Sequence, residues 1–226
     1  FFPVPSFNIP LGALIPKAVS NFIIAEKSIS VSNIVNGTTR LQPCVMQIGQ
    51  ASGLLAALSI KNRVDPKNIS VRQVQLALLD ANGYIMPYKD VTQKDHYFKA
   101  IQKIGATGLL RGVGVPTGWA NATYFNPNDK VKLDEFSIAW NKKFIAHSFK
   151  SDNDLTISDA LFVAAKLSNT SVEKIKSSFE LKWKSIGLEN YDLQRPILRY
   201  ELATILDQYN VFNIFDVDIY GNYTKL

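Results

Sequence analysis

Apolar residues recur at helical spacing over most of the chain beyond residue 42. Apolar side chains at every third or fourth position line one face of a helix, and a folded chain buries that face. The pattern predicts helices over residues 43–62, 70–82, 95–105, 133–149, 158–167, 171–186 and 198–209. Proline favours the first turn of a helix and glycine the position after its end, so Pro43 and Gly83 suit the start of the first helix and the end of the second.

The remaining segments hold turn-forming residues or short apolar runs. Four prolines interrupt residues 1–17, which we expect to be extended and irregular. Asn21-Phe-Ile-Ile-Ala25 suits a short buried strand, and residues 28–39, rich in Ser, Asn, Gly and Thr, suit a loop with one short strand. Residues 113–129 are rich in Gly, Pro and Asn and suit a second loop. The predicted fold class is therefore mainly α with a small β component.

Composition excludes several classes of function. The 226 residues are 46% apolar and 19% charged, which is typical of a globular protein. The net charge is +6 and the basic residues are scattered, so we expect no nucleic-acid partner. The longest apolar helical stretch, residues 53–60, is shorter than the roughly 20 residues that cross a bilayer, so we expect no membrane span. The chain has no Gly-x-Ser-x-Gly motif, which argues against a serine hydrolase.

A metal site is not expected either. Cys44 is the only cysteine, and His96 and His147 are the only histidines, with no metal-binding spacing around them. Asp216 and Asp218 flank a valine and could bind a cation, but such pairs more often lie in solvated turns.

The segment from Asn36 to Leu58 carries the most distinctive chemistry. The N-terminus of a helix bears a partial positive charge and several unpaired N–H groups, which stabilise a nearby anion. Beyond Pro43, the small residues Gly49, Gly53 and Ala56 or Ala57 recur every three or four positions. Such a stripe permits close packing of another helix without any ligand, or the close approach of a cofactor.

Five motifs in this region occur in a fixed order. They are Pro10-Leu-Gly-Ala-Leu-Ile-Pro-Lys17, Asn21-Phe-Ile-Ile-Ala25, Gly37-Thr-Thr-Arg40, Pro43 and Gly49-Gln-Ala-Ser-Gly53. This order resembles the carboxyl-terminal portion of an FAD-dependent oxidoreductase family of secreted bacterial proteins, some of whose members carry the label xanthan lyase. The resemblance covers about residues 8–82.

The resemblance implies FAD as cofactor and an exported protein. Arg40 and the N–H groups that follow Gln42 and Pro43 would face the flavin, and Gly49 and Gln50 would support its approach. No Gly-x-Gly-x-x-Gly occurs in the chain, so the pyrophosphate of FAD would be held by an N-terminal dinucleotide-binding half outside it. That half is the expected partner. We assign no catalytic residue, and we expect the fragment alone to be inactive and to bind FAD weakly.

A second resemblance begins after residue 84. Residues 88–112 and 124–136 resemble an S-layer homology repeat in their Asp-Val opening, in Gly108 and Gly112, and in Glu135-Phe136. Residues 155–161 and 195–206 echo the same pattern. The resemblance implies an oxidoreductase-like segment at 1–84 and a helical domain of packed repeats at 85–226. Cell-surface polysaccharide is then a possible partner, with Trp119 as the best exposed aromatic residue. The alternative to a flavoprotein fragment is a non-catalytic interaction domain at the cell surface.

Overall fold

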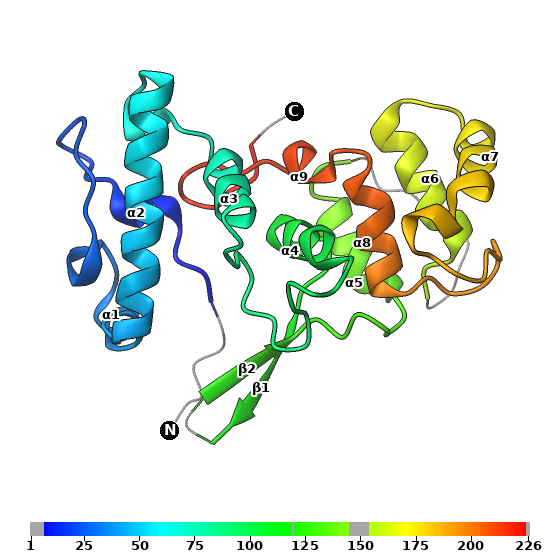
Figure 1. Ribbon diagram of the computed structural model, residues 1–226, viewed down its shortest axis with the longest axis horizontal. Helices are drawn as coiled ribbons and strands as arrows, with labels where there is room; N and C mark the ends of the chain where they lie inside the picture. Colours follow the sequence, from blue (N-terminus) through cyan, green and yellow to red (C-terminus); the bar gives the residue numbers. More distant parts are fainter. Residues whose placement is uncertain (1–6, 119, 145–153, 225–226) are drawn as a thin grey trace. The chain divides into compact units, whose positions relative to one another are not determined.

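The computed structural model describes residues 7–118, 120–144 and 154–224. This part of the chain is mainly helical with one small two-stranded sheet, which confirms the predicted fold class (Figure 1). The chain divides by its internal contacts into two compact units. Residues 7–84 and 216–224 form one, here called the N-terminal unit, and residues 85–215 belong to the other, the helical unit.

The N-terminal unit combines short 3-10 helices with α-helices, one of them long. Its elements are η1 (Leu11–Leu14), η2 (Glu26–Ser28), α1 (Asn33–Thr39), α2 (Gln42–Asn62), η3 (Pro66–Asn68) and α3 (Val71–Asp80). Two small apolar clusters hold these elements together. One gathers around Leu14, Ile29 and Ile48, and the other around Leu55, Ile69 and Val74. Helix α2 contributes to both clusters and is therefore the main support of the unit.

The helical unit contains the hairpin and the other α-helices. Its elements are α4 (Phe98–Thr107), β1 (Val113–Thr117), β2 (Ala120–Tyr124), α5 (Leu133–Trp140), α6 (Ile157–Ser168), α7 (Val172–Lys182), η4 (Lys184–Ile186), α8 (Arg199–Asp207) and α9 (Val211–Ile214). β1 and β2 pair antiparallel, with Val113 opposite Tyr124 and Thr117 opposite Ala120. Helix α8 packs against α4, α6 and α9. Large side chains such as Phe125, Phe136 and Trp140 are buried in this unit.

A closed ring of backbone hydrogen bonds lies inside the helical unit. The N–H of Val131 donates to the carbonyl of Ile197 (3.0 Å), that of Ile197 to Leu155 (2.8 Å), and that of Leu155 to Val131 (2.9 Å). All three residues are fully buried. Helices α5, α6 and α8 each begin two residues after one of them. Three extended segments, each followed by a helix, thus meet at one point.

Most of the predicted helices are confirmed. Helix α2 begins at Gln42 with Pro43 in its first turn and ends at Asn62, as expected. Helices α3, α4, α6, α7 and α8 lie within or close to their predicted ranges. The predicted helix over residues 133–149 is shorter, because α5 ends at Trp140; residues 145–149 lie outside the described part of the chain.

Three predictions about the irregular segments are wrong. Residues 21–25 form no strand, because Ile24 makes a single backbone hydrogen bond, to Leu14 (2.8 Å), and no neighbouring strand runs beside it in the described chain. Residues 33–39 form α1 instead of a loop, since the Ser32 hydroxyl accepts from the N–H of Val35 and caps the helix. The loop predicted at 113–129 contains the β1–β2 hairpin.

Candidate functional site

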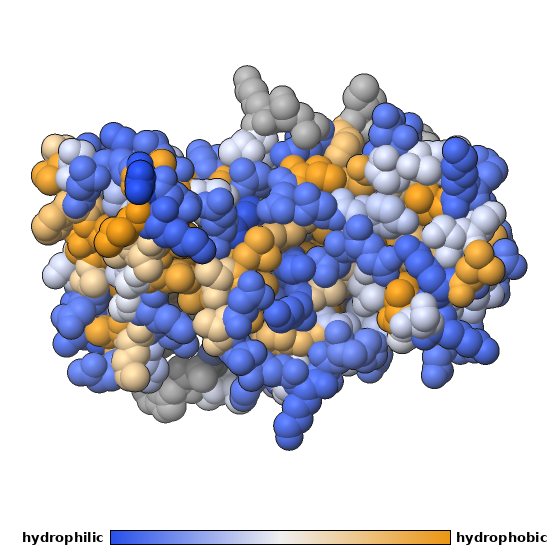
Figure 2. All heavy atoms as spheres, turned by 45° about the horizontal axis from the view of Figure 1, so that its top comes forward, coloured by the Kyte–Doolittle hydropathy of each residue, from blue (hydrophilic) through white to orange (hydrophobic). Residues whose placement is uncertain are grey.

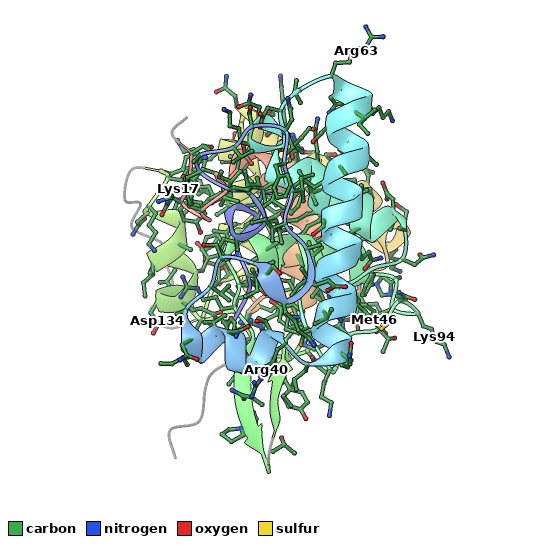
Figure 3. All side chains as sticks on the ribbon, turned by 90° about the vertical axis from the view of Figure 1, so that its left-hand side faces the viewer. Lys17, Arg40, Met46, Arg63, Lys94 and Asp134 are labelled. Carbon is green, nitrogen blue, oxygen red and sulfur yellow. The ribbon has the colours of Figure 1, made fainter. Side chains whose placement is uncertain are left out.

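The candidate cofactor-binding residues lie at the corner between α1 and α2 and along α2. Helix α1 ends at Thr39, and the N–H of the next residue, Arg40, donates to the carbonyl of Asn36 (3.2 Å). Leu41 is extended, and α2 begins at the next residue. Arg40, Gln42 and Pro43 therefore lie together at this corner, and Figure 3 shows Arg40 and Met46 near the N-terminal end of α2, with Arg63 at the opposite end.

The N-terminal turn of α2 lacks a cap. Leu41 occupies the N-cap position, no side chain accepts a cap hydrogen bond there, and the first turn holds no acidic residue. Leu41, Gln42 and Pro43 are exposed, and so is the Arg40 side chain beside them. The first turn of α2 therefore carries neither a side-chain cap nor an acidic residue to offset the partial positive charge of the helix end, and Arg40 adds a full positive charge. This end of α2 can stabilise an anion placed before it.

Helix α2 presents two different faces. Its buried face carries Ile48, Ser52, Leu55 and Ser59. The Ser52 and Ser59 hydroxyls donate to carbonyls one turn earlier in the helix, at 2.9 and 2.8 Å, so neither hydroxyl is left unsatisfied. Ser52 also lies 3.3 Å from the carbonyl of Ile24, which fixes the extended segment against the helix.

The opposite face of α2 is exposed and holds the stripe of small residues. Gly49, Gly53 and Ala57 lie on it, with Met46 and Ile60 before and after them. A Cβ atom added at Gly49 or Gly53 would meet nothing within 4 Å, so within the described chain no neighbour packs closely against these glycines. Figure 2 shows apolar side chains at the surface of this unit, in the left part of the view. The predicted residues Gly49 and Gln50 are thus open to a ligand or partner.

By length and composition, α2 could cross a membrane. It has 21 residues, is predominantly apolar, and is mostly not buried. The stretch considered from the sequence, residues 53–60, is only part of this helix. A single helix of this kind gives weak support for a span, because core helices of soluble proteins can be equally long and apolar. The expected absence of a span stays a prediction.

In the helical unit, the residues that resemble an S-layer homology repeat have structural roles. The Asp90 carboxylate accepts from the N–H groups of Phe125 (2.8 Å) and Asn126 (2.6 Å). Gly108 ends α4 in the left-handed conformation, with φ of 75°. Gly112 lies against the ring of Tyr88, where a larger residue would clash. The contacts of Asp90, Gly108 and Gly112 are therefore contacts that shape the fold.

An arginine missed by the sequence analysis lies at the centre of this unit. The Arg199 guanidinium donates to the carbonyls of Phe125 (2.8 Å) and Arg111 and to the carboxylate of Glu135 (2.7 Å). Its side chain is 7% exposed and lies over the Phe125 ring. A positive charge in the first turn of a helix is unfavourable, because the helix N-terminus is itself partly positive. An arginine at such a position is therefore a sequence signal that it pairs with a specific acceptor elsewhere in the fold.

Helices α5, α6 and α8, which follow the hydrogen-bond ring, each have an acidic residue at their third position: Glu135, Asp159 and Glu201. Asp159 accepts from the N–H of Thr156 (2.9 Å), and Glu201 accepts from the N–H of Leu198 (2.9 Å). Each carboxylate therefore caps the N-terminus of its own helix. Glu201 also binds the Arg195 guanidinium (2.7 Å), and this hydrogen bond is the main reason why the pKa of Arg195 is raised. Glu135 instead accepts from the N–H of Arg111 (2.9 Å).

The remaining candidates from the sequence are the possible cation ligands and the exposed aromatic residue. The described residues include no group of three or more His, Cys, Asp or Glu side chains that could hold a metal ion. Asp218 accepts from the N–H groups of Tyr220 and Asn222 (2.9 Å each) and so organises a turn. Trp119 and His147 lie outside the described residues.

Comparison with known proteins gives one match. A family model described as FAD dependent oxidoreductase matches residues 1–78 and ends before the helical unit. Neither the search of curated proteins nor the search of solved structures found a match. The matched residues include the α1–α2 corner, the open N-terminal turn of α2 and its stripe of small residues. Residues 1–78 are therefore similar to a region of the FAD-dependent oxidoreductase family.

Proposed function

We propose that the N-terminal unit supplies the last flavin-facing helix of an exported bacterial FAD-dependent oxidoreductase-like protein. The FAD would be held mainly by a dinucleotide-binding half outside these 226 residues, because the chain has no Gly-x-Gly-x-x-Gly motif. The observation that carries the proposal is that the family match covers a helix whose N-terminal turn is uncapped, free of acidic residues and exposed.

The chemistry of this helix end suits a flavin. Reduction places negative charge on N1 and the C2 carbonyl of the isoalloxazine ring. A helix N-terminus aimed at these atoms stabilises the reduced form more than the oxidised form. Arg40 would add to this effect at the same corner. Gly49 and Gln50, about two turns along α2, would permit the ring or its protein support to come close.

Flavin absorbance of the complete gene product tests this proposal. We expect a flavin spectrum in the full-length protein and little FAD binding by the 226-residue chain alone. A charge change at the helix end then tests the orientation. Gln42→Glu in the full-length protein places a negative charge in the first turn of α2, and we expect the flavin midpoint potential to fall by about 20 mV, or about 1 kcal/mol.

Gln73→Glu on α3 is the matched control, since Gln73 is also exposed and lies on a different helix. A colourless full-length protein would refute the flavin assignment and favour the alternative, an interaction domain. A flavoprotein whose potential responds equally to both substitutions would refute the orientation of α2.

We also propose that the helical unit is a set of S-layer-homology-like repeats with a structural role. The closed ring of Val131, Leu155 and Ile197 supports a repeat architecture, because three segments of the same form meet in it. Polysaccharide binding is the alternative for this unit. Arg199, the arginine at the start of α8, is buried and bound to Glu135, so it is not available to a sugar. We therefore expect no retention on purified cell-wall polymer; retention above that of a serum albumin control would favour the alternative.

A further inference from the structure

The C-terminal segment Asp216–Thr224, here called the strap, has a shape of its own. The N–H of Asp218 donates to the carbonyl of Asn222 (2.8 Å), and the N–H of Thr224 donates to the carbonyl of Asp216 (3.0 Å). The carboxylate of Asp218 accepts two more backbone N–H groups inside the turn. These bonds hold the strap as a small folded loop with its ends side by side.

The strap docks against the start of the N-terminal unit. The N–H of Gly12, in η1, donates to the carbonyl of Ile219 at 2.7 Å. A Cβ atom at position 12 would lie 2.9 Å from that carbonyl oxygen and 3.2 Å from the ring of Tyr220. The close approach of the two backbones therefore requires glycine at this position.

A buried arginine marks a second contact of the strap. The Arg72 side chain on α3 is 2% exposed, and its Nε lies 3.9 Å from a carboxylate oxygen of Asp216. Burial lowers the pKa of Arg72 to about 10, and the negative charge of Asp216 opposes this shift. Since a buried cation needs a nearby anion, Asp216 compensates a charge that α3 places inside the N-terminal unit.

We propose that the strap is a clasp that completes the oxidoreductase-like unit from a distant part of the chain. The family match ends at residue 78, so the clasp is an element beyond the family region. The helical unit, residues 85–215, is then an insert anchored at both ends, with its chain entering after Tyr84 and leaving before Asp216. The proposal depends on contacts inside the N-terminal unit and is independent of flavin binding.

Hydrogen exchange on the full 226-residue chain tests the clasp. In the unchanged protein we expect protection at the amides of Asp218, Thr224 and Gly12, all of which donate backbone hydrogen bonds. Gly12→Ala forces the two backbones apart. Overpacking of this kind should lower protection in the strap by about tenfold or more. The ring amides of Val131, Leu155 and Ile197 serve as internal reference and should keep their protection.

Two further variants secure the result. Gly49→Ala is the matched control, because nothing lies within 4 Å of the added methyl group, and strap protection should not fall. Asp218→Ala disrupts the turn without touching position 12, and it decides the matter if Gly12→Ala prevents the unit from folding. Loss of protection at both Gly12 and the strap in this variant supports the clasp. Strap amides that exchange at unprotected rates in the unchanged chain, or Gly12 protection unaffected by Asp218→Ala, overturn it.

Discussion

Replacing Arg199 with alanine tests the central polar contact of the helical unit. The guanidinium satisfies the carbonyls of Phe125 and Arg111 and pairs with the Glu135 carboxylate. Phe125 is fully buried, so water cannot replace the guanidinium as hydrogen-bond donor to its carbonyl without opening the core. The substitution therefore removes one charged donor and leaves several acceptors without a partner.

The expected loss follows from these contacts. A hydrogen bond from a charged group contributes about 1.5–3 kcal/mol, and breaking a buried ion pair on one side costs about 3–5 kcal/mol. Glu135 is 30% exposed, so water can solvate its carboxylate once the arginine is removed. The loss of stability therefore comes mainly from the two carbonyls that lose their donor. We expect Arg199→Ala to lower the free energy of unfolding by about 3–5 kcal/mol and Tm by about 10–15 °C.

Tryptophan fluorescence is a suitable assay, because Trp140 and Trp183 are buried in the helical unit and the N-terminal unit has no tryptophan. Urea unfolding followed by this signal reports on that unit alone. Lys94→Ala, at an exposed position, is the control and should leave the transition unchanged. A loss of less than about 1 kcal/mol in Arg199→Ala would refute the reasoning. Full stability in Arg199→Met would show that the stem of the side chain, and not its hydrogen bonds, supports the core.

Three further predictions concern single residues. Gly105→Ala should destabilise the helical unit by about 1–3 kcal/mol in the same urea assay, because the added methyl group would overlap the phenol of Tyr88; an unchanged midpoint would contradict this close packing. Gly49→Ala should stabilise the N-terminal unit by about 0.5–1 kcal/mol, measured by circular dichroism on heating, since alanine favours the helix and meets no neighbour. A lower melting temperature would count against an open stripe. Backbone N–H groups, first that of Asn222, lower the pKa of Asp218 below its ordinary 3.8. Its stabilising effect is therefore complete above pH 3.8 and is lost as the pH falls through the lower folded-state pKa. An acid titration of the Asn222 amide resonance should show this, and Asp218→Asn should abolish the transition.

The sequence predicts the helices of this chain well where local signals agree. Pro43 marks the first turn of α2, and the apolar spacing that follows it extends to the observed end at Asn62. Thr156 and Asp159 form the capping pair at the start of α6. In these cases the residues that decide the structure are neighbours in the chain, so pattern alone is sufficient.

The failures share a different cause, dependence on distant residues. Residues 21–25 have the composition of a strand, but a strand requires a neighbour, and the described chain supplies none. The docking of the strap on Gly12 joins positions more than 200 residues apart, which no local pattern encodes. The candidate site at the α1–α2 corner depends partly on local sequence and partly on distant groups. Arg40, Gln42 and Pro43 lie together because they are close in sequence, but a local pattern does not encode what faces the open end of α2.

The hydrogen-bond ring has a consequence for how the helical unit could evolve. In a linear array of repeats, the last repeat can be deleted with the loss of one interface. Here each of Val131, Leu155 and Ile197 gives one bond to a neighbour and receives one from the other, so removing any segment breaks two of the three pairings. Such a closed arrangement has no terminal member. We expect its size to be fixed at three, and its relatives to gain or lose the module only as a whole.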